Sequence, residues 1–129
     1  MAVMPILEWP DPFLSRTCAP VTTFDAGLAK VASNMLETMY HAQGRGLAAP
    51  QVGRDLRMFV MDIDWKTGHR KPWVCVNPSL TSTGADMATN DEGCLSIPGV
   101  LAAVTRPSAV TLAWSDLDGE RHQAGLSGF

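Results

Sequence analysis

The stretch TTFDAGLAKVASNMLETMY, residues 22–40, decides the fold because it is the one long segment with the spacing of a helix. Its apolar residues recur at steps of three and four, which predicts an amphipathic helix with one buried face. This apolar stripe consists of Leu28, Val31, Ala32, Met35, Leu36 and Met39. Thr23 or Asp25 can cap the start of the helix, and Gly44 and Gly46 favour its end.

The segments on either side of this helix predict an α+β domain, with one long N-terminal helix packed on antiparallel β-sheets. Before the helix, residues 1–22 contain four prolines and are expected to form an extended arm over the body. After it, short apolar runs at 57–63, 72–78, 100–107 and 109–116 predict strands. Residues 64–70 read as a hairpin connection, and DLDGER, residues 116–121, as an Asp-Gly turn. The last residues, GLSGF at 125–129, indicate no complete final element.

The composition is that of one globular domain, residues 1–129. Of the 129 residues, 46% are hydrophobic and 18% are charged, which suffices for a real core. A net charge of −3 gives no reason to expect nucleic acid or an anionic membrane as a partner. No apolar run is long enough to span a bilayer, and the N-terminus lacks the basic region of a signal peptide. Three cysteines without paired spacing argue against a disulfide framework, so the cytoplasm is the expected compartment.

The glycine-rich stretch GRGLAAPQVG, residues 44–53, is the first candidate site. It lacks the Gly-Lys-Ser/Thr sequence of a phosphate loop and the glycine spacing of a dinucleotide loop. Its glycines allow a close backbone approach, and Leu47, Ala48 and Ala49 can wall a pocket. The side-chain amide of Gln51 could donate to a carbonyl oxygen there. The alternative is a plain helix-to-strand connection with a surface glutamine.

The second candidate site is DEGCLS, residues 91–96, in a turn-prone stretch. A cysteine is most often a small hydrophobic residue, and this interpretation suits Cys75 in the strand-like WVCVN. It suits Cys94 less well, because Cys94 follows Gly93 and two acidic residues. As a nucleophile Cys94 needs a cationic neighbour, and as a metal thiolate it needs two or three further ligands. The local sequence shows neither set of partners.

Taken together, the two stretches resemble the peptide deformylase family. GRGLAAPQ is similar to the first of its three signature motifs, and EGCLS, with Cys94 placed 43 residues after Gln51, to the second. The resemblance continues through ILEWPDPFLSRTCAPV in the N-terminal arm, MLETMYHAQGRG at the end of the helix, VCVNPSL, and CLSIPGV. It covers nearly all of the chain.

The resemblance implies a metal-dependent hydrolase that removes the N-formyl group from the initiator methionine of nascent proteins, including chains at the ribosome. Cys94 then corresponds to a thiolate ligand of iron(II) or zinc, beside two histidines of a His-Glu-x-x-His helix and a bound water. Gln51 and the backbone N–H of Leu95 correspond to the donors that stabilise the oxyanion. The substrate-binding positions correspond to Arg45, Gly46, Leu47 and Gly93.

The third motif, His-Glu-x-x-His, is absent, so both histidine ligands and the general base are missing. The three histidines, His41, His69 and His122, are expected to be surface residues. The family's metal-binding helix begins at about AGLSGF, residues 124–129, where this sequence ends. A shortened chain, a fragmentary gene and a metal-free relative all remain open. The chain alone is expected to be inactive, and the alternative is a catalytically dead protein that binds N-terminal Met peptides.

Two further expectations concern the surroundings of the second motif. Without a metal-binding helix, an exposed hydrophobic groove is expected beside Cys94 and Gln51. Glu92 is expected to be structural rather than a replacement base, with Arg106 as its ion-pair partner.

Overall fold

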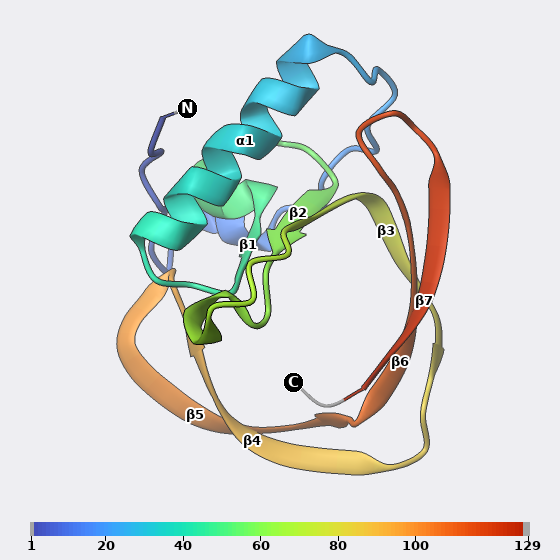
Figure 1. Ribbon diagram of the computed structural model, residues 1–129. Coiled ribbons are helices and arrows are strands. Elements are labelled where there is room, and N and C mark those ends of the chain that lie inside the picture. Colours follow the sequence, from blue (N-terminus) through green and yellow to red (C-terminus); the bar gives the residue numbers. More distant parts are fainter. Residues whose placement is uncertain (1, 128–129) are drawn as a thin grey trace.

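The computed structural model describes residues 2–127, which form one α-helix, three short 3-10 helices and seven strands (Figure 1). The helical elements are η1 (Pro12–Ser15), α1 (Ala26–His41), η2 (Ala49–Val52) and η3 (Trp65–Thr67). The strands are β1 (Gly46–Ala48), β2 (Met58–Met61), β3 (Trp73–Thr83), β4 (Met87–Cys94), β5 (Ile97–Pro107), β6 (Ala109–Ser115) and β7 (Arg121–Ser127). The α+β class with one helix and antiparallel sheets is therefore confirmed.

Helix α1 forms where the apolar stripe predicts it. Of the two candidate caps, Asp25 is the one used: its Oδ1 accepts from the backbone N–H of Leu28 at 2.9 Å. After His41 the chain turns through Gln43, which has φ +59°, so a glutamine rather than a glycine adopts the left-handed conformation here. The Gly44 N–H then bonds to the Met39 carbonyl at 2.9 Å and closes the helix end.

The main sheet has the order β1-β2-β3-β6-β7, and every neighbouring pair is antiparallel. Helix α1 lies across the β1–β2 side of this sheet (Figure 1). Its buried side chains meet those of β2 and β3 in the core, where Met35, Met39, Val60 and Val76 are fully covered. Cys75 is 0% exposed, and burial raises the pKa of its thiol to about 12, so it is the small hydrophobic residue that the sequence predicts.

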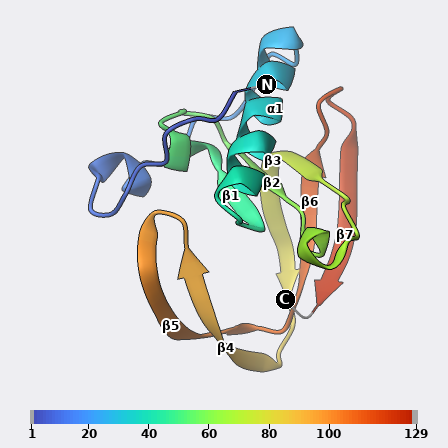
Figure 2. The same cartoon turned by 60° about the vertical axis from the view of Figure 1, so that its left-hand side comes forward.

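Strands β4 and β5 form a separate two-stranded sheet, which we call the β4–β5 arm (residues 87–107). The chain leaves the main sheet after β3 and re-enters it at β6, and β3 and β6 pair directly with each other. Backbone bonds from Gly84 to Ala109 (2.7 Å) and from Ser108 to Asp86 (2.8 Å) close the base of the arm. Figures 1 and 2 show the arm curving away from the main sheet toward the end of α1 and the N-terminal segment.

Two sequence expectations about strands need correction. The stretch 91–96, expected to be turn-prone, contains a turn at 95–96, but 91–94 belong to β4, which is held by cross-strand pairing with β5 rather than by burial. The stretch GLSGF at 125–129 was expected to contain no complete element, but 125–127 belong to β7 and pair with β6. Residues 128–129 lie outside the described part of the chain.

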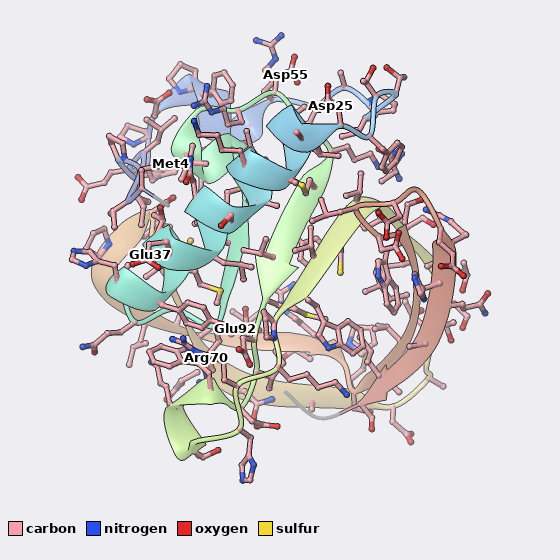
Figure 3. All side chains as sticks on the ribbon, turned by 45° about the horizontal axis from the view of Figure 1, so that its top comes forward. Met4, Asp25, Glu37, Asp55, Arg70 and Glu92 are labelled. Carbon is pink, nitrogen blue, oxygen red and sulfur yellow. The ribbon has the colours of Figure 1, made fainter. Side chains whose placement is uncertain are left out.

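From residue 2 on, the N-terminal segment forms the expected extended arm, interrupted by a turn at Trp9 and Pro10 and by η1. The start of α1, with Asp25, and Met4 of the N-terminal segment can be followed in Figure 3. No helix within residues 2–127 is both long and apolar enough to cross a membrane.

Candidate functional site

The first candidate segment folds into an edge strand followed by a single 3-10 turn. Strand β1 pairs with β2 on one side and lies at the edge of the main sheet. Gln51 lies in η2, and its side chain turns back so that Oε1 accepts from the Ala48 N–H at 2.9 Å. Because a backbone N–H must face the amide oxygen, this bond fixes the orientation of the amide and directs Nε2 outward.

The second candidate segment forms the tip of the β4–β5 arm. Cys94 ends β4 and Ile97 begins β5, so Leu95 and Ser96 are the two residues of a hairpin turn. The strand register shifts between Gly93 and Cys94, and the extra residues on β5 include Gly99, whose φ of +76° favours glycine. The turn places the Cys94 side chain at the surface and buries Ser96, which is only 3% exposed.

Gln51 joins these two segments across 43 residues of sequence. Its Nε2 donates to the Ser96 Oγ at 3.1 Å and lies 3.5 Å from the Cys94 Sγ. The amide nitrogen therefore faces the end of β4 and the hairpin turn that follows it. The sequence predicted Gln51 and Cys94 as site residues, whereas Ser96, the last residue of the EGCLS motif, received no role although it anchors the amide.

The N-terminal arm ties the same two segments together from outside. The Leu7 N–H bonds to the Gln51 carbonyl at 2.7 Å, and the Trp9 N–H bonds to the Ser96 carbonyl at 2.8 Å. The extended N-terminal segment therefore bonds to a residue of each motif. Sequence reasoning predicted that an arm covers the body but did not predict this connection.

The predicted substrate-binding residues lie near the contact between Gln51 and the Cys94–Ser96 turn, and they differ in exposure. Arg45 and Gly46 are exposed, and the Arg45 carbonyl accepts from the Asp62 N–H at 2.9 Å. Leu47 is 2% exposed with its side chain in the core, so only its backbone can meet a ligand. Gly93 is exposed and leaves little room for a side chain, because an added Cβ would lie 3.1 Å from Leu101.

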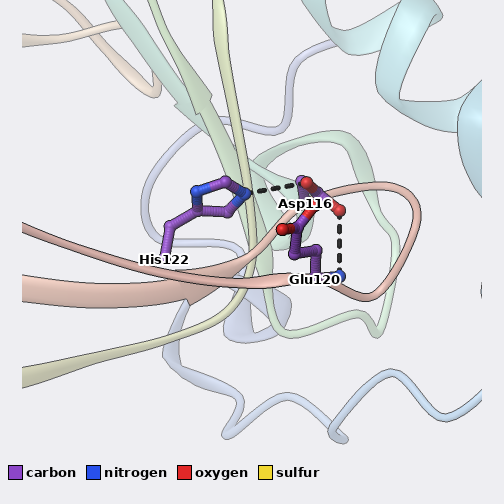
Figure 4. A group of neighbouring side chains, drawn as sticks. All are labelled: Asp116, Glu120 and His122. Atoms are coloured by element: carbon purple, nitrogen blue, oxygen red, sulfur yellow. Dashed lines mark hydrogen bonds and ion pairs between the residues drawn. The ribbon is translucent and has the colours of Figure 1, made fainter.

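The described residues do not complete a metal site at Cys94. Within residues 2–127 the one group of three metal-ligating side chains is Asp116, Glu120 and His122, whose ligand atoms lie within 4.8 Å of one another (Figure 4). The three histidines are exposed, as expected. A catalytic divalent ion usually takes three protein ligands. One thiol among the described residues therefore does not fit such an ion.

The Asp116 group is explained by the β6–β7 turn. Asp116 Oδ1 accepts from the backbone N–H groups of Asp118 and Glu120, and Oδ2 accepts from His122 Nε2 at 2.8 Å. The bond from His122 holds the pKa of Asp116 below its usual value, and the two backbone bonds add to the effect. The His122 ring also stacks on Trp114 at 5.5 Å. Because both carboxylate oxygens are used, we assign this group to hairpin structure.

Glu92 and Arg106 form the predicted ion pair. They lie on opposite strands of the β4–β5 arm and make two bonds, of 2.6 and 2.9 Å. The hydrogen bond to Arg106 lowers the pKa of Glu92. The pair is exposed, so it fixes the arm rather than compensating for a buried charge.

The expected apolar exposure beside Cys94 is present on β5. Ile97, Val100 and Leu101 are exposed, and Leu101 has 73% of its surface accessible. Two open hollows of the described residues lie elsewhere, one along β3, β6 and β7 and one between Ile63, Trp73 and Leu126. Exposed apolar side chains therefore lie on the strand that follows Cys94, but neither hollow is lined by Gln51 or Cys94, so the groove itself stays a prediction.

This architecture matches solved hydrolase structures. A peptide deformylase from Thermotoga maritima superimposes with a TM-score of 0.92 at 36% identity, covering 99% of this chain and 84% of that one. A peptide deformylase from Legionella pneumophila gives 0.93 at 38% identity, covering 99% and 74%. The fold is therefore that of an α+β hydrolase of this type.

The sequence comparisons agree. The peptide deformylase of Zymomonas mobilis subsp. mobilis is 42% identical over 132 residues, which cover 99% of this chain and 75% of that protein. The peptide deformylase of Rhizobium meliloti is 38% identical over 128 residues, covering 99% and 74%. A family model described as polypeptide deformylase matches residues 3–129. The chain belongs to the polypeptide deformylase family.

Proposed function

We propose that the Gln51–Cys94 site serves the removal of the N-formyl group from the initiator methionine of nascent proteins in the cytoplasm. The observation that carries this proposal is the amide of Gln51, held 3.5 Å from the Cys94 sulfur by anchors on both sides. A fixed amide donor is what an oxyanion site requires, and here this donor lies beside an exposed thiol. Family membership supplies the substrate class.

The residues have distinct roles in this proposal. Gln51 Nε2 and the Leu95 backbone N–H donate to the formyl oxygen as negative charge develops on it, and each such donor is worth about 3–4 kcal/mol. The unpaired edge of β1, at Gly46 and Leu47, accepts the peptide backbone as an added strand. Arg45 and Gly93 border the methionine side chain.

Cys94 is the proposed ligand for iron(II) or zinc, the metals that the family resemblance implies. Since the described residues supply one ligand and not three, no hydrolytic step is assigned to a metal in this chain. We expect weak metal binding and negligible formate release from the 129 residues alone. Formate release that depends on added iron(II), zinc or cobalt would contradict this expectation, with the Zymomonas mobilis enzyme as the positive control.

Peptide binding tests the site itself. We expect a formyl-Met tripeptide to bind more tightly than the same peptide without the formyl group, as measured by calorimetry. Gln51→Ala should weaken binding of the formyl peptide by about two- to tenfold, the factor for one hydrogen bond. Gln123→Ala, an exposed change on β7, is the matched control. Equal affinity for both peptides, together with no effect of Gln51→Ala, would remove the proposal.

A second candidate is a protein of this family that binds N-terminal Met peptides without hydrolysing them. The incomplete ligand set around Cys94 favours it. Equal binding of the formylated and unformylated peptides would support this candidate, whereas tighter binding of the formylated peptide that is weakened in Gln51→Ala would support the first proposal.

A further inference from the structure

The segment between β2 and β3 contacts the first motif although neither motif includes it. Its 3-10 turn η3 presents Trp65, whose indole Nε1 donates to the Gly44 carbonyl at 2.8 Å. The Trp65 ring meets Tyr40 edge-on, with centroids 5.1 Å apart, so the indole is held in place by the end of α1. The next carbonyl, that of Arg45, accepts from Asp62 at the start of the same segment.

Gly44 in turn lies directly against the arm tip. A Cβ placed on Gly44 would lie 2.7 Å from Leu95 Cδ1 and 3.3 Å from its Cγ, so the Leu95 side chain occupies the space that any other residue at position 44 would need. Leu95 is half-buried and packs against the main core. The position of the Gly44 backbone therefore sets how far Leu95 can approach, and with it the turn that follows Cys94.

We propose that Trp65 is a positioning residue for the Cys94–Ser96 turn, because its indole N–H holds Gly44 in the place where Leu95 packs. This inference rests on the proposed function, which assigns the chemistry to Cys94 and to the Leu95 N–H. The connection runs from a side chain outside both motifs, through a carbonyl of the first, to the hairpin turn of the second. Trp65 touches neither Cys94 nor Gln51 in this arrangement and acts through Gly44.

Hydrogen exchange on the whole chain tests the connection, because two amides report its two ends. The Gly44 amide bonds to Met39 and reports the loop, and the Trp9 amide bonds to the Ser96 carbonyl and reports the turn. In Trp65→Phe, which keeps a ring but loses the donor, we expect both amides to exchange about two- to tenfold faster, the factor for one hydrogen bond. The Asn77 amide, bonded to Arg57, should keep its wild-type rate and exclude global destabilisation.

Trp114→Phe is the matched control, because Trp114 stacks between Trp73 and His122 away from this loop. It should leave the Gly44 and Trp9 amides at their wild-type rates. If Trp65→Phe accelerates the Gly44 amide alone, Trp65 serves only its own loop and the proposal is wrong. Wild-type rates at both amides would refute it as well.

Substitutions at Gly44 and Leu95 test the contact between these two residues directly. They remain informative if Trp65→Phe does not fold. Gly44→Ala should accelerate the Trp9 amide, since the new methyl group displaces Leu95 and the turn. Adding Leu95→Ala should restore the wild-type rate by freeing that space, and failure of this rescue would refute the contact. Gly125→Ala, where an added Cβ meets nothing within 4 Å, is the control. None of these measurements needs metal or hydrolysis, so their failure can be told apart from a failure of the formyl-peptide proposal.

Discussion

The part-buried hydrogen bond between Tyr40 and Asp62 leads to a quantitative prediction. The Tyr40 hydroxyl donates to Asp62 Oδ2 at 2.6 Å, and the Lys71 N–H adds contacts of 3.0 and 3.1 Å to the same carboxylate, which is 1% exposed. A hydrogen bond to a charged group contributes about 1.5–3 kcal/mol. Tyr40→Phe should therefore lower the free energy of unfolding in urea by that amount, and the melting temperature by about 5–10 °C.

The same bond predicts a pH dependence. Burial, then the hydrogen bond to Asp62, then the charge of Asp62 raise the pKa of Tyr40 to about 12. The guanidinium of Arg70, a residue labelled in Figure 3, lies 3.9 Å from the centroid of the Tyr40 ring and opposes this shift only in part. The folded state thus retains the phenolic proton that the unfolded state, with a pKa of 10.0, loses first. This contribution to stability is complete below pH 10 and is lost as the pH rises to about 12. Tyr40→Phe should lack it, while the similar contribution of Cys75 remains in both proteins.

A direct titration checks the cause. Tyr40 is the one tyrosine in the chain, so tyrosinate absorbance near neutral to strongly alkaline pH reports it alone. Asp62→Asn keeps an acceptor but removes the charge, and should move the pKa of Tyr40 back toward 10. A wild-type titration at an ordinary tyrosine pKa, or a loss below about 0.5 kcal/mol in Tyr40→Phe, would refute the reasoning.

Three further predictions concern single contacts. Asn77 has φ +49°, and its side-chain amide bonds to the backbone N–H and C=O of Val21 at 2.7 and 2.9 Å. Asn77→Ala should therefore lower the free energy of unfolding in urea by about 2 kcal/mol. Asn77→Gly loses the same two bonds without the backbone strain, so it should separate the two contributions. Asp25→Ala removes the cap of α1 and should cost about 1 kcal/mol, whereas Asp25→Ser should cost much less, as thermal melts can show. Because the bond to Arg106 lowers the pKa of Glu92, the ion pair stabilises the fold above the pKa that Glu92 has in the unfolded chain, and this contribution is lost as the pH falls. Glu92→Gln should therefore flatten the acid side of the plot of stability against pH. An unchanged plot would contradict this.

The helix and the central strands could be predicted because their signals are local. The stripe through Leu28 and Met35 and the cap at Asp25 are readable within a few residues, as are the apolar runs of β2 and β3. Strand β4 could not be read this way, because its residues are mostly exposed and it is defined by pairing with β5. The final strand β7 was missed for a similar reason: it follows from its register with β6 rather than from its own composition.

The site was predictable in its parts but not in its assembly. Gln51 and Cys94 stand out through their motifs, yet their contact depends on the course of the whole β4–β5 arm. Ser96, Trp65 and the backbone of Trp9 hold the junction together through hydrogen bonds between residues far apart in sequence. A single serine or tryptophan has no pattern that indicates such a partner.

The β4–β5 arm closes at its base with its own backbone bonds, so the main sheet does not depend on its length. The position of its tip does depend on that length, since each cross-strand pair of residues advances the turn by about 3.3 Å. Deleting one such pair would retract the thiol by about 3.3 Å, which is close to the whole 3.5 Å that separates the Cys94 sulfur from the Gln51 amide nitrogen. The length of the β4–β5 arm therefore decides whether Gln51 and Cys94 meet. The main sheet can tolerate a change in that length, whereas the contact between the glutamine and the cysteine cannot.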